Sequence, residues 1–176
     1  MSVTIRTPVP ADADRLARIN IDAWRSAYAG IVPASYLDAM DLTRYRERWQ
    51  HNLIDASPSR NFLVADVDGE LAAYGICGPY RPQGDAAEED TSGWGELYAI
   101  YTHPDRQGRG VGSAVLCAAV ALLHDQEYAD AGLWVLRDNH AGQRWYAARG
   151  WRPDGATSSW LAGDAALPEL RLRRHL

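Results

Sequence analysis

The sequence predicts an α/β fold in which strands and helices follow one another in the order β-α-α-β-β-β-α-β-α-β-β. Short runs rich in aromatic and β-branched residues indicate strands, and longer segments with apolar residues at helical spacing indicate helices. A tight turn at Asp68-Gly69, between two apolar runs, indicates a β-hairpin. These signals alternate along the whole chain, so a single domain covering residues 1–176 is expected.

The first half of the chain begins with a short strand at 3–6. Two prolines then precede a helix over 11–28 that Gly30 ends, with Leu16, Ile19, Ala23 and Ala27 on one face. Pro33 begins a second helical region, 34–53, which is interrupted near Met40-Asp41. A turn at 57–59 and the hairpin strands 62–66 and 71–77 follow.

The second half contains an acidic segment, 79–95, that is expected to be a solvated loop. Near a cleft such a loop could instead attract a cationic amine. A strand at 97–102 precedes a helix that starts at Val111 and presents Val115, Ala118, Ala119 and Leu122 on the same face. The remaining elements are a strand at 133–136, a helix at 139–149 closed by Gly150, and two strands, from Trp151 and at 169–173, joined by a loop at 154–168.

Composition excludes several classes of protein. The net charge of −5 argues against nucleic acid as the main partner. The sequence has no apolar run of membrane-spanning length and no apolar signal core near Met1, so a cytoplasmic protein without a membrane partner is expected. Cys77 and Cys117 lie in apolar runs, and both are expected to be buried free thiols in a reducing compartment.

The segment 96–123 organises the chain as a strand, a glycine-rich turn and a buried helix. Gly108, Gly110 and Gly112 leave backbone amides without a Cβ in front of them, at the start of a helix. The first amides of a helix lack intrahelical acceptors and the helix dipole is positive there, so this turn predicts an anion site. The sequence contains no lysine, which excludes a Walker-type loop, and the glycine spacing does not match the dinucleotide fingerprint.

Gln107-Gly-Arg-Gly-Val-Gly112 closely resembles the coenzyme A pyrophosphate motif of the GNAT superfamily of acyl-CoA-dependent N-acyltransferases. The segment from Asn139 through Trp145-Tyr146 to Gly150-Trp151 is similar to a second motif of that family, with tryptophan where phenylalanine is usual. The resemblance implies a mixed, mostly antiparallel central sheet of about seven strands flanked by helices on both faces. It also implies acetyl-CoA as co-substrate, and no cluster of residues has the spacing of a metal site.

The resemblance also implies roles for particular residues. Tyr146 would protonate the departing thiolate, and Glu96 would accept the ammonium proton directly or through water. Each residue has a structural alternative: core packing for Tyr146, a solvent-facing carboxylate for Glu96, and a helix N-cap for Asn139. The residues expected to bind the cofactor are Ile100, Tyr101, Thr102, Gln107, Gly108, Arg109, Gly110, Val111, Gly112, Ser113, Asn139 and Tyr146.

In this family the acceptor enters beside the first two helices. Trp24 and Tyr28 are four residues apart and share a helix face there. They are expected either to pack in the core or to form an aromatic wall that holds a cationic amine. The pattern Trp-x-x-x-Tyr-x-Gly-Ile-x-Pro around them resembles one found in bacterial GNAT proteins of undefined substrate.

These features favour an N-acetyltransferase that moves an acetyl group directly from the thioester to a primary amine of a small molecule or peptide. The alternative is a non-catalytic acyl-CoA-binding sensor or interaction protein with the same fold. An acid at the sulfur position, Tyr146, and a carboxylate, Glu96, favour the enzyme, because a pure binder needs neither. The resemblance also leaves open a homodimer.

Overall fold

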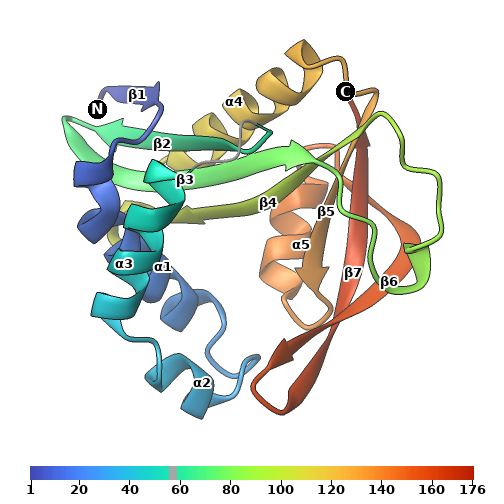
Figure 1. Ribbon diagram of the computed structural model, residues 1–176, viewed down its shortest axis with the longest axis horizontal. Helices are drawn as coiled ribbons and strands as arrows, with labels where there is room; N and C mark the ends of the chain where they lie inside the picture. The colour runs from blue at the N-terminus through green and yellow to red at the C-terminus, as the bar shows by residue number, and fades with distance from the viewer. Residues whose placement is uncertain (56–58) are drawn as a thin grey trace.

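The computed structural model describes residues 1–55 and 59–176. Most of the turn expected at 57–59 therefore lies outside the described residues. Within these ranges the strands form one seven-stranded sheet in the order β1-β2-β3-β4-β5-β7-β6 (Figure 1). The strands are β1 (Val3–Arg6), β2 (Asn61–Val67), β3 (Glu70–Pro79), β4 (Trp94–Thr102), β5 (Asp130–Leu136), β6 (Arg152–Ala162) and β7 (Ala165–His175).

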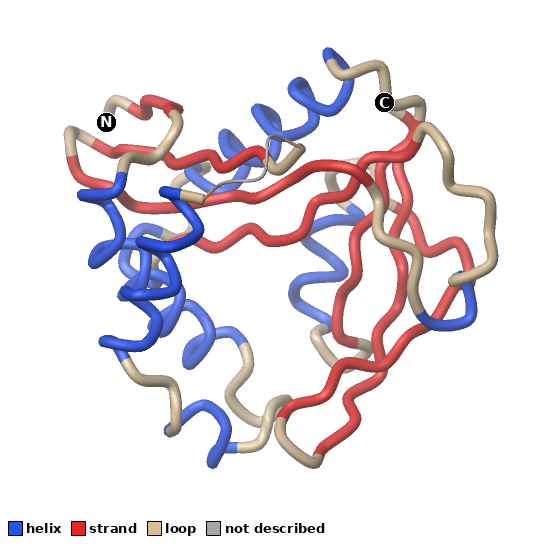
Figure 2. The backbone as a smooth tube through the Cα atoms, in the orientation of Figure 1, coloured by secondary structure: helices blue, strands red, loops and turns tan. Residues whose placement is uncertain are grey.

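Helices cover both faces of the sheet (Figures 1 and 2). One face packs against α1 (Ala13–Ala27) and α3 (Leu42–Ile54), and the other packs against α4 (Val111–Asp125) and α5 (His140–Ala147). The short helix α2 (Ala34–Asp38) connects α1 to α3. This architecture confirms the predicted α/β class and the order of its elements.

The sheet is antiparallel except between its two central strands. The strands β4 and β5 pair in parallel over only three positions, from Trp94↔Asp130 to Glu96↔Gly132. Beyond this point β4 stays paired with β3 as far as Thr102, whereas β5 stays paired with β7 as far as Leu136. The two strands therefore diverge and open a wedge in the sheet, which we call the sheet gap (Figure 2).

Local signals account for the boundaries that sequence analysis predicted correctly. Asp68 and Gly69 have φ values of 51° and 87°, the left-handed conformation that a tight hairpin turn needs. The Asp41 carboxylate accepts a hydrogen bond from the Arg44 amide at 2.8 Å, and this N-cap explains the interruption between α2 and α3.

The expected loop at 154–168 is wrong. The strands β6 and β7 run through this segment and turn at Gly163, whose φ is 63°. Pro153 and Pro168 obscured the strand signal, because proline is disfavoured inside a sheet. Pro168 nevertheless lies in the inner strand β7. Here β6 is the edge strand, and its register with β7 shifts between Pro153 and Thr157.

The acidic segment 79–95 is largely exposed, as expected for a solvated loop, but specific contacts also fix its position. Asp85 accepts hydrogen bonds from the Thr157 amide and hydroxyl, both at 2.7 Å. Glu89 forms an ion pair with Arg171 at 2.6 Å. These contacts hold the segment against β6 and β7, and Tyr80 within it is buried.

Two expectations about burial are also corrected. Cys77 is buried in the core, where desolvation raises the pKa of its thiol to about 11, but Cys117 is exposed. In α4 the buried face is Val111, Val115, Leu116, Ala119 and Leu123 rather than the stripe through Ala118 and Leu122. Among the described residues, none of the helices combines the length and hydropathy needed to span a membrane.

Candidate active site

The sheet gap opens into a cavity of about 700 Å³. Its walls come from the C-terminal end of α1, the diverging part of β4, the turn before α4, the strand β5 and the helix α5. Residues 97–102 of β4 line this cavity with the edge that no longer pairs with β5. That edge offers backbone amides and carbonyls to an extended ligand.

The glycine turn (residues 107–112) forms one end of the cavity. Gly108 and Gly110 have φ values of 72° and 80°, which side-chain-bearing residues rarely adopt. Gly110 is the N-cap of α4, and its carbonyl accepts the first helical hydrogen bond, from the Ala114 amide. The amides of 111–113 therefore have no intrahelical acceptor and lie at the positive end of the helix dipole, an arrangement suited to an anion.

Close packing fixes the height of α4 above β4. A Cβ atom on Gly112 would lie 3.0 Å from Thr102 Oγ1 and 3.6 Å from the Trp145 ring. A glycine at this position lets the helix N-terminus approach the strand edge. Gln107 adds a further link, because its side-chain amide donates to the Thr102 carbonyl at 3.2 Å.

An arginine that sequence analysis did not identify lies beside the glycine turn. The Arg149 guanidinium donates to Ser113 Oγ at 2.8 Å and stacks 4.0 Å from the centre of the Trp145 ring. All three residues line the cavity. By contrast, Arg109, which was expected to contact the cofactor, is exposed and is not among the lining residues.

The helix α5 brings Asn139 and Tyr146 to the same cavity. Asn139 caps the helix, with its side-chain oxygen accepting from the Gly142 amide at 2.9 Å, so the structural alternative for this residue holds and it also lines the cavity. The Tyr146 ring packs at 6.1 Å from the buried Trp151 ring. Among the described residues nothing hydrogen-bonds the Tyr146 hydroxyl, and burial raises its pKa well above the usual range. The phenol therefore stays protonated at neutral pH.

Glu96 lies inside the molecule rather than at a solvent-facing strand end. Its side chain is 3 % exposed, and the Arg81 guanidinium donates to Oε1 at 2.6 Å and to Oε2 at 3.2 Å. The Arg81 amide donates to Oε2 as well, at 2.9 Å. Both carboxylate oxygens are thus occupied, and Glu96 is not among the residues that line the cavity. Its role as the base stays a prediction.

Trp24 and Tyr28 belong to a larger aromatic cluster, of which Tyr28 and Tyr101 line the cavity whereas Trp24, Tyr36 and Trp160 do not. The cluster joins residues of α1, α2, β4 and β6, with ring centroids 4.9 to 6.5 Å apart: Trp24, Tyr28, Tyr36, Tyr101 and Trp160. The Tyr28 and Tyr101 hydroxyls are 3.1 Å apart, and burial raises the pKa of both groups. All five side chains are partly exposed, so the cluster combines packing with an accessible aromatic surface.

Another residue without a predicted role, Glu169 on β7, lies on this face of the sheet. It is half-buried, and its nearest polar partner is the Gln83 amide at 3.4 Å. Burial, and then repulsion from Glu96, raise the pKa of Glu169 to about 7. No local sequence signal identifies this glutamate, because its surroundings come from segments that are distant in the sequence, among them β4, β5 and β6.

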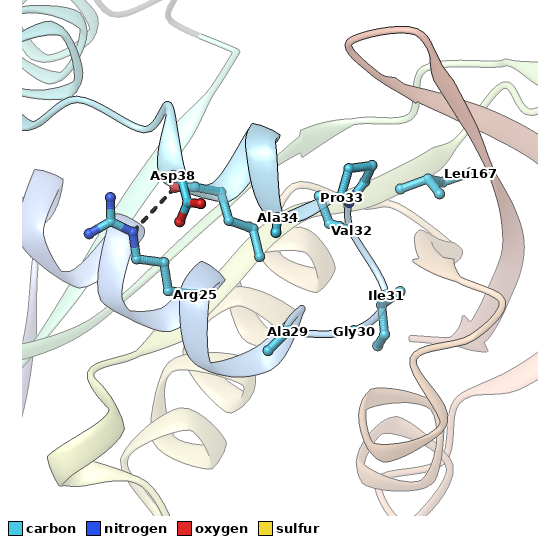
Figure 3. A pocket seen from close by; sticks show the side chains of 10 residues that line it. Arg25, Ala29, Gly30, Ile31, Val32, Pro33, Ala34, Asp38 and Leu167 are labelled. Atoms are coloured by element: carbon cyan, nitrogen blue, oxygen red, sulfur yellow. Dashed lines mark hydrogen bonds between the residues drawn. The ribbon is translucent and has the colours of Figure 1, made fainter.

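A second cavity, of about 580 Å³, lies where the α1–α2 connection meets the β6–β7 hairpin (Figure 3). Arg25 is its one cation, and the guanidinium donates to the Leu37 and Met40 carbonyls, each at 3.2 Å. Arg25 therefore braces α2. Apart from Asp38, the other described lining residues are apolar or have no ionisable side chain, and none belongs to the glycine turn or to α5.

Comparisons with known proteins agree with this geometry. The model of the acetyltransferase (GNAT) family matches residues 20–151. The uncharacterized N-acetyltransferase YuaI of Bacillus subtilis (strain 168) is 27% identical over 137 residues, 78% of this chain and 73% of YuaI. Spermidine N(1)-acetyltransferase of Thermoplasma acidophilum is 23% identical over 162 residues, 90% of this chain and 94% of that protein. The crystal structure of PaiA N-acetyltransferase from Thermoplasma acidophilum in complex with coenzyme A covers the whole of both chains, with a TM-score of 0.77 at 18% identity.

Proposed function

Because the chain belongs to the GNAT acetyltransferase family, we propose that it transfers an acetyl group from acetyl-CoA directly to a primary amine of a small molecule or peptide. One observation supports this most. A single cavity is lined by the glycine turn, by the unpaired edge of β4, by Tyr146 and by the Tyr28–Tyr101 pair. These are the parts needed to bind a phosphorylated thioester at one end and an amine at the other.

Each part has a task in the proposed reaction. The amides of 111–113 would hold the pyrophosphate. The edge of β4 at 100–102 would bind the pantetheine arm and offer an amide to the oxyanion of the tetrahedral intermediate. Tyr146 would give its proton to the departing thiolate.

The proposed transfer is direct, without an acylated cysteine. A covalent route would need a thiol at the cavity. Of the two cysteines, Cys77 is buried and Cys117 is exposed on α4, and neither is among the residues that line the cavity.

A cationic amine is the acceptor class that the aromatic cluster favours, since aromatic faces attract ammonium groups. A polyamine fits this chemistry, in line with the spermidine acetyltransferase that the chain is similar to. An amino acid or a peptide N-terminus would present the same ammonium group.

The first test is calorimetric titration with acetyl-CoA and with free CoA, followed by a thiol-release assay over a panel of amines that includes spermidine. We expect both cofactors to bind and at least one amine to be turned over. Tight binding without turnover on any amine would favour the sensor alternative, and failure to bind either cofactor would contradict both functions.

Replacing Trp24 with leucine should raise KM for the amine about tenfold, about 1.4 kcal/mol, because it removes an aromatic face from the cluster. Trp24→Phe keeps a ring and serves as the matched control. Steady-state kinetics should show little change in kcat and in acetyl-CoA affinity. If KM for the amine stays the same in Trp24→Leu, the aromatic cluster packs the fold and does not bind the acceptor.

A further inference from the structure

Glu169 is distinguished from the other carboxylates on its face of the sheet by its lack of a cation. Glu96 pairs with Arg81, Asp154 pairs with Arg171, and Asp130 pairs with Arg173. Glu169 is half-buried, and among the described residues it has no ion pair, only the Gln83 amide at 3.4 Å. Burying an ionised carboxylate without a charged partner is unfavourable, so a cation placed beside Glu169 would be stabilised.

Strand register places Glu169 beside the aromatic cluster. On β5 its partner is Leu136, and on β6 its partner is Ser158, two residues from Trp160. Directly paired residues of antiparallel strands point to the same face, and diagonal neighbours two residues along also share it. Leu136 packs in one group with Trp24, Tyr28 and Trp160, so the Glu169 side chain lies on the face that carries the aromatic cluster.

The charged groups around Glu169 do not neutralise it. Arg171 is two residues along on the same face of β7, but it is engaged by Asp154 at 2.7 Å and by Glu89 at 2.6 Å. Glu96, from β4, is close enough to repel the Glu169 carboxylate, and Tyr28, from α1, is within electrostatic range of it. Arg81 is likewise bound to Glu96, so neither Arg81 nor Arg171 neutralises Glu169.

We infer that the cation beside Glu169 is the ammonium group of the acceptor, and that Glu169 both binds this group and takes its proton. The inference rests on the proposed function and names its proton acceptor. Like Glu96, Glu169 is not among the residues that line the cavity; it is placed by its position on the sheet face that carries the aromatic cluster. Glu169 on β7 thus takes the role of base that sequence analysis gave to Glu96. Arg81 binds both carboxylate oxygens of Glu96.

The proton balance of the reaction is then complete. The ammonium gives one proton to Glu169, and the lone pair of the neutral amine forms the N–C bond at the thioester carbonyl. The C–S bond breaks with its electron pair going to sulfur, which takes the Tyr146 proton. The second proton of the attacking nitrogen restores the Tyr146 phenol, and Glu169 releases its proton to solvent. The products are an amide, a CoA thiol and one proton.

The environment of Glu169 suits this task. Burial raises its pKa to about 7, so the carboxylate is a better base than an exposed glutamate and is still ionised in much of the population at neutral pH. The base form increases as the pH rises through about 7, so kcat/KM should rise over the same interval.

The test compares Glu169→Gln with Glu169→Asp and with Glu88→Gln, an exposed control that removes the same charge. The probe is spermidine or, if another panel amine is turned over faster, that amine. We expect Glu169→Gln to lower kcat/KM at pH 7 about 100-fold and to abolish the acid limb of the pH–rate profile, with acetyl-CoA affinity unchanged. Glu169→Asp should recover part of the activity, and Glu88→Gln should match the unmodified protein. Thermal unfolding checks that each variant is folded.

Glu96→Gln, by contrast, should keep the acid limb of the pH–rate profile near pH 7, because Glu96 is not the proton acceptor in this account. An unchanged kcat/KM and acid limb in Glu169→Gln would overturn the inference alone. If Glu169→Gln raised only KM for the amine and kept the acid limb of the pH–rate profile, Glu169 would not be the proton acceptor. If the unmodified protein turned over none of the amines, the proposed function and this inference would fall together.

Discussion

Gly110→Asp is expected to lower acetyl-CoA affinity at least about 100-fold, or about 2.7 kcal/mol. Gly110 is the N-cap of α4 with φ at 80°, and no other atom lies within 4 Å of the Cβ that a side chain would add. The new side chain therefore has room, and aspartate is among the residues that best tolerate this conformation. Its carboxylate would stand against the amides proposed to hold the pyrophosphate, where two like charges repel.

Gly110→Asn is the matched control, because it has the same shape and backbone preference without the charge. Calorimetric titration of both variants should give much weaker binding for Gly110→Asp than for Gly110→Asn, while their thermal unfolding is similar. Equal affinities for acetyl-CoA in the two variants would remove the glycine turn from the pyrophosphate site.

Tyr146→Phe is expected to lower kcat about 100-fold with little change in acetyl-CoA affinity, the size of effect that loss of a general acid produces. The ring contacts with Trp145 and Trp151 are retained in phenylalanine. The hydroxyl has no hydrogen-bond partner among the described residues, so its removal should not lower the free energy of unfolding.

Tyr128→Phe is a suitable control, since Tyr128 packs against the same core but does not line the cavity. Burst and steady-state measurements of thiol release would separate the chemical step from binding. A kcat for Tyr146→Phe close to that of the unmodified protein would show that another group protonates the thiolate.

Much of the fold could be predicted because its signals are local. The hairpin at Asp68-Gly69, the helix cap at Asp41 and the glycine turn are each specified by neighbouring residues. The length of the strands β6 and β7 was underestimated where prolines and small residues weakened the local strand pattern. The full length of these strands depends on contacts with distant parts of the chain: β5 pairs with β7, and the segment 79–95 contacts β6.

The glycine turn and Tyr146 lie in recognisable motifs, and the structure brings them to one cavity. The rest of the candidate site could not be predicted in this way. Glu96 and Arg81 are fifteen residues apart and belong to different segments, β4 and the loop that follows β3. The position of Glu169 depends on strand register with β5 and β6. Such contacts arise from tertiary topology, which neither periodicity nor motif spacing records.

Direct transfer of an acetyl group to an amine is the central claim, and mass spectrometry tests it most directly. The protein would be incubated with acetyl-CoA and the best amine of the panel, and both the amine and the intact protein would be weighed. We predict an amine heavier by one acetyl group and a protein of unchanged mass. Thiol release without an acetylated amine, or a protein that carries the acetyl group in the absence of the amine, would contradict it.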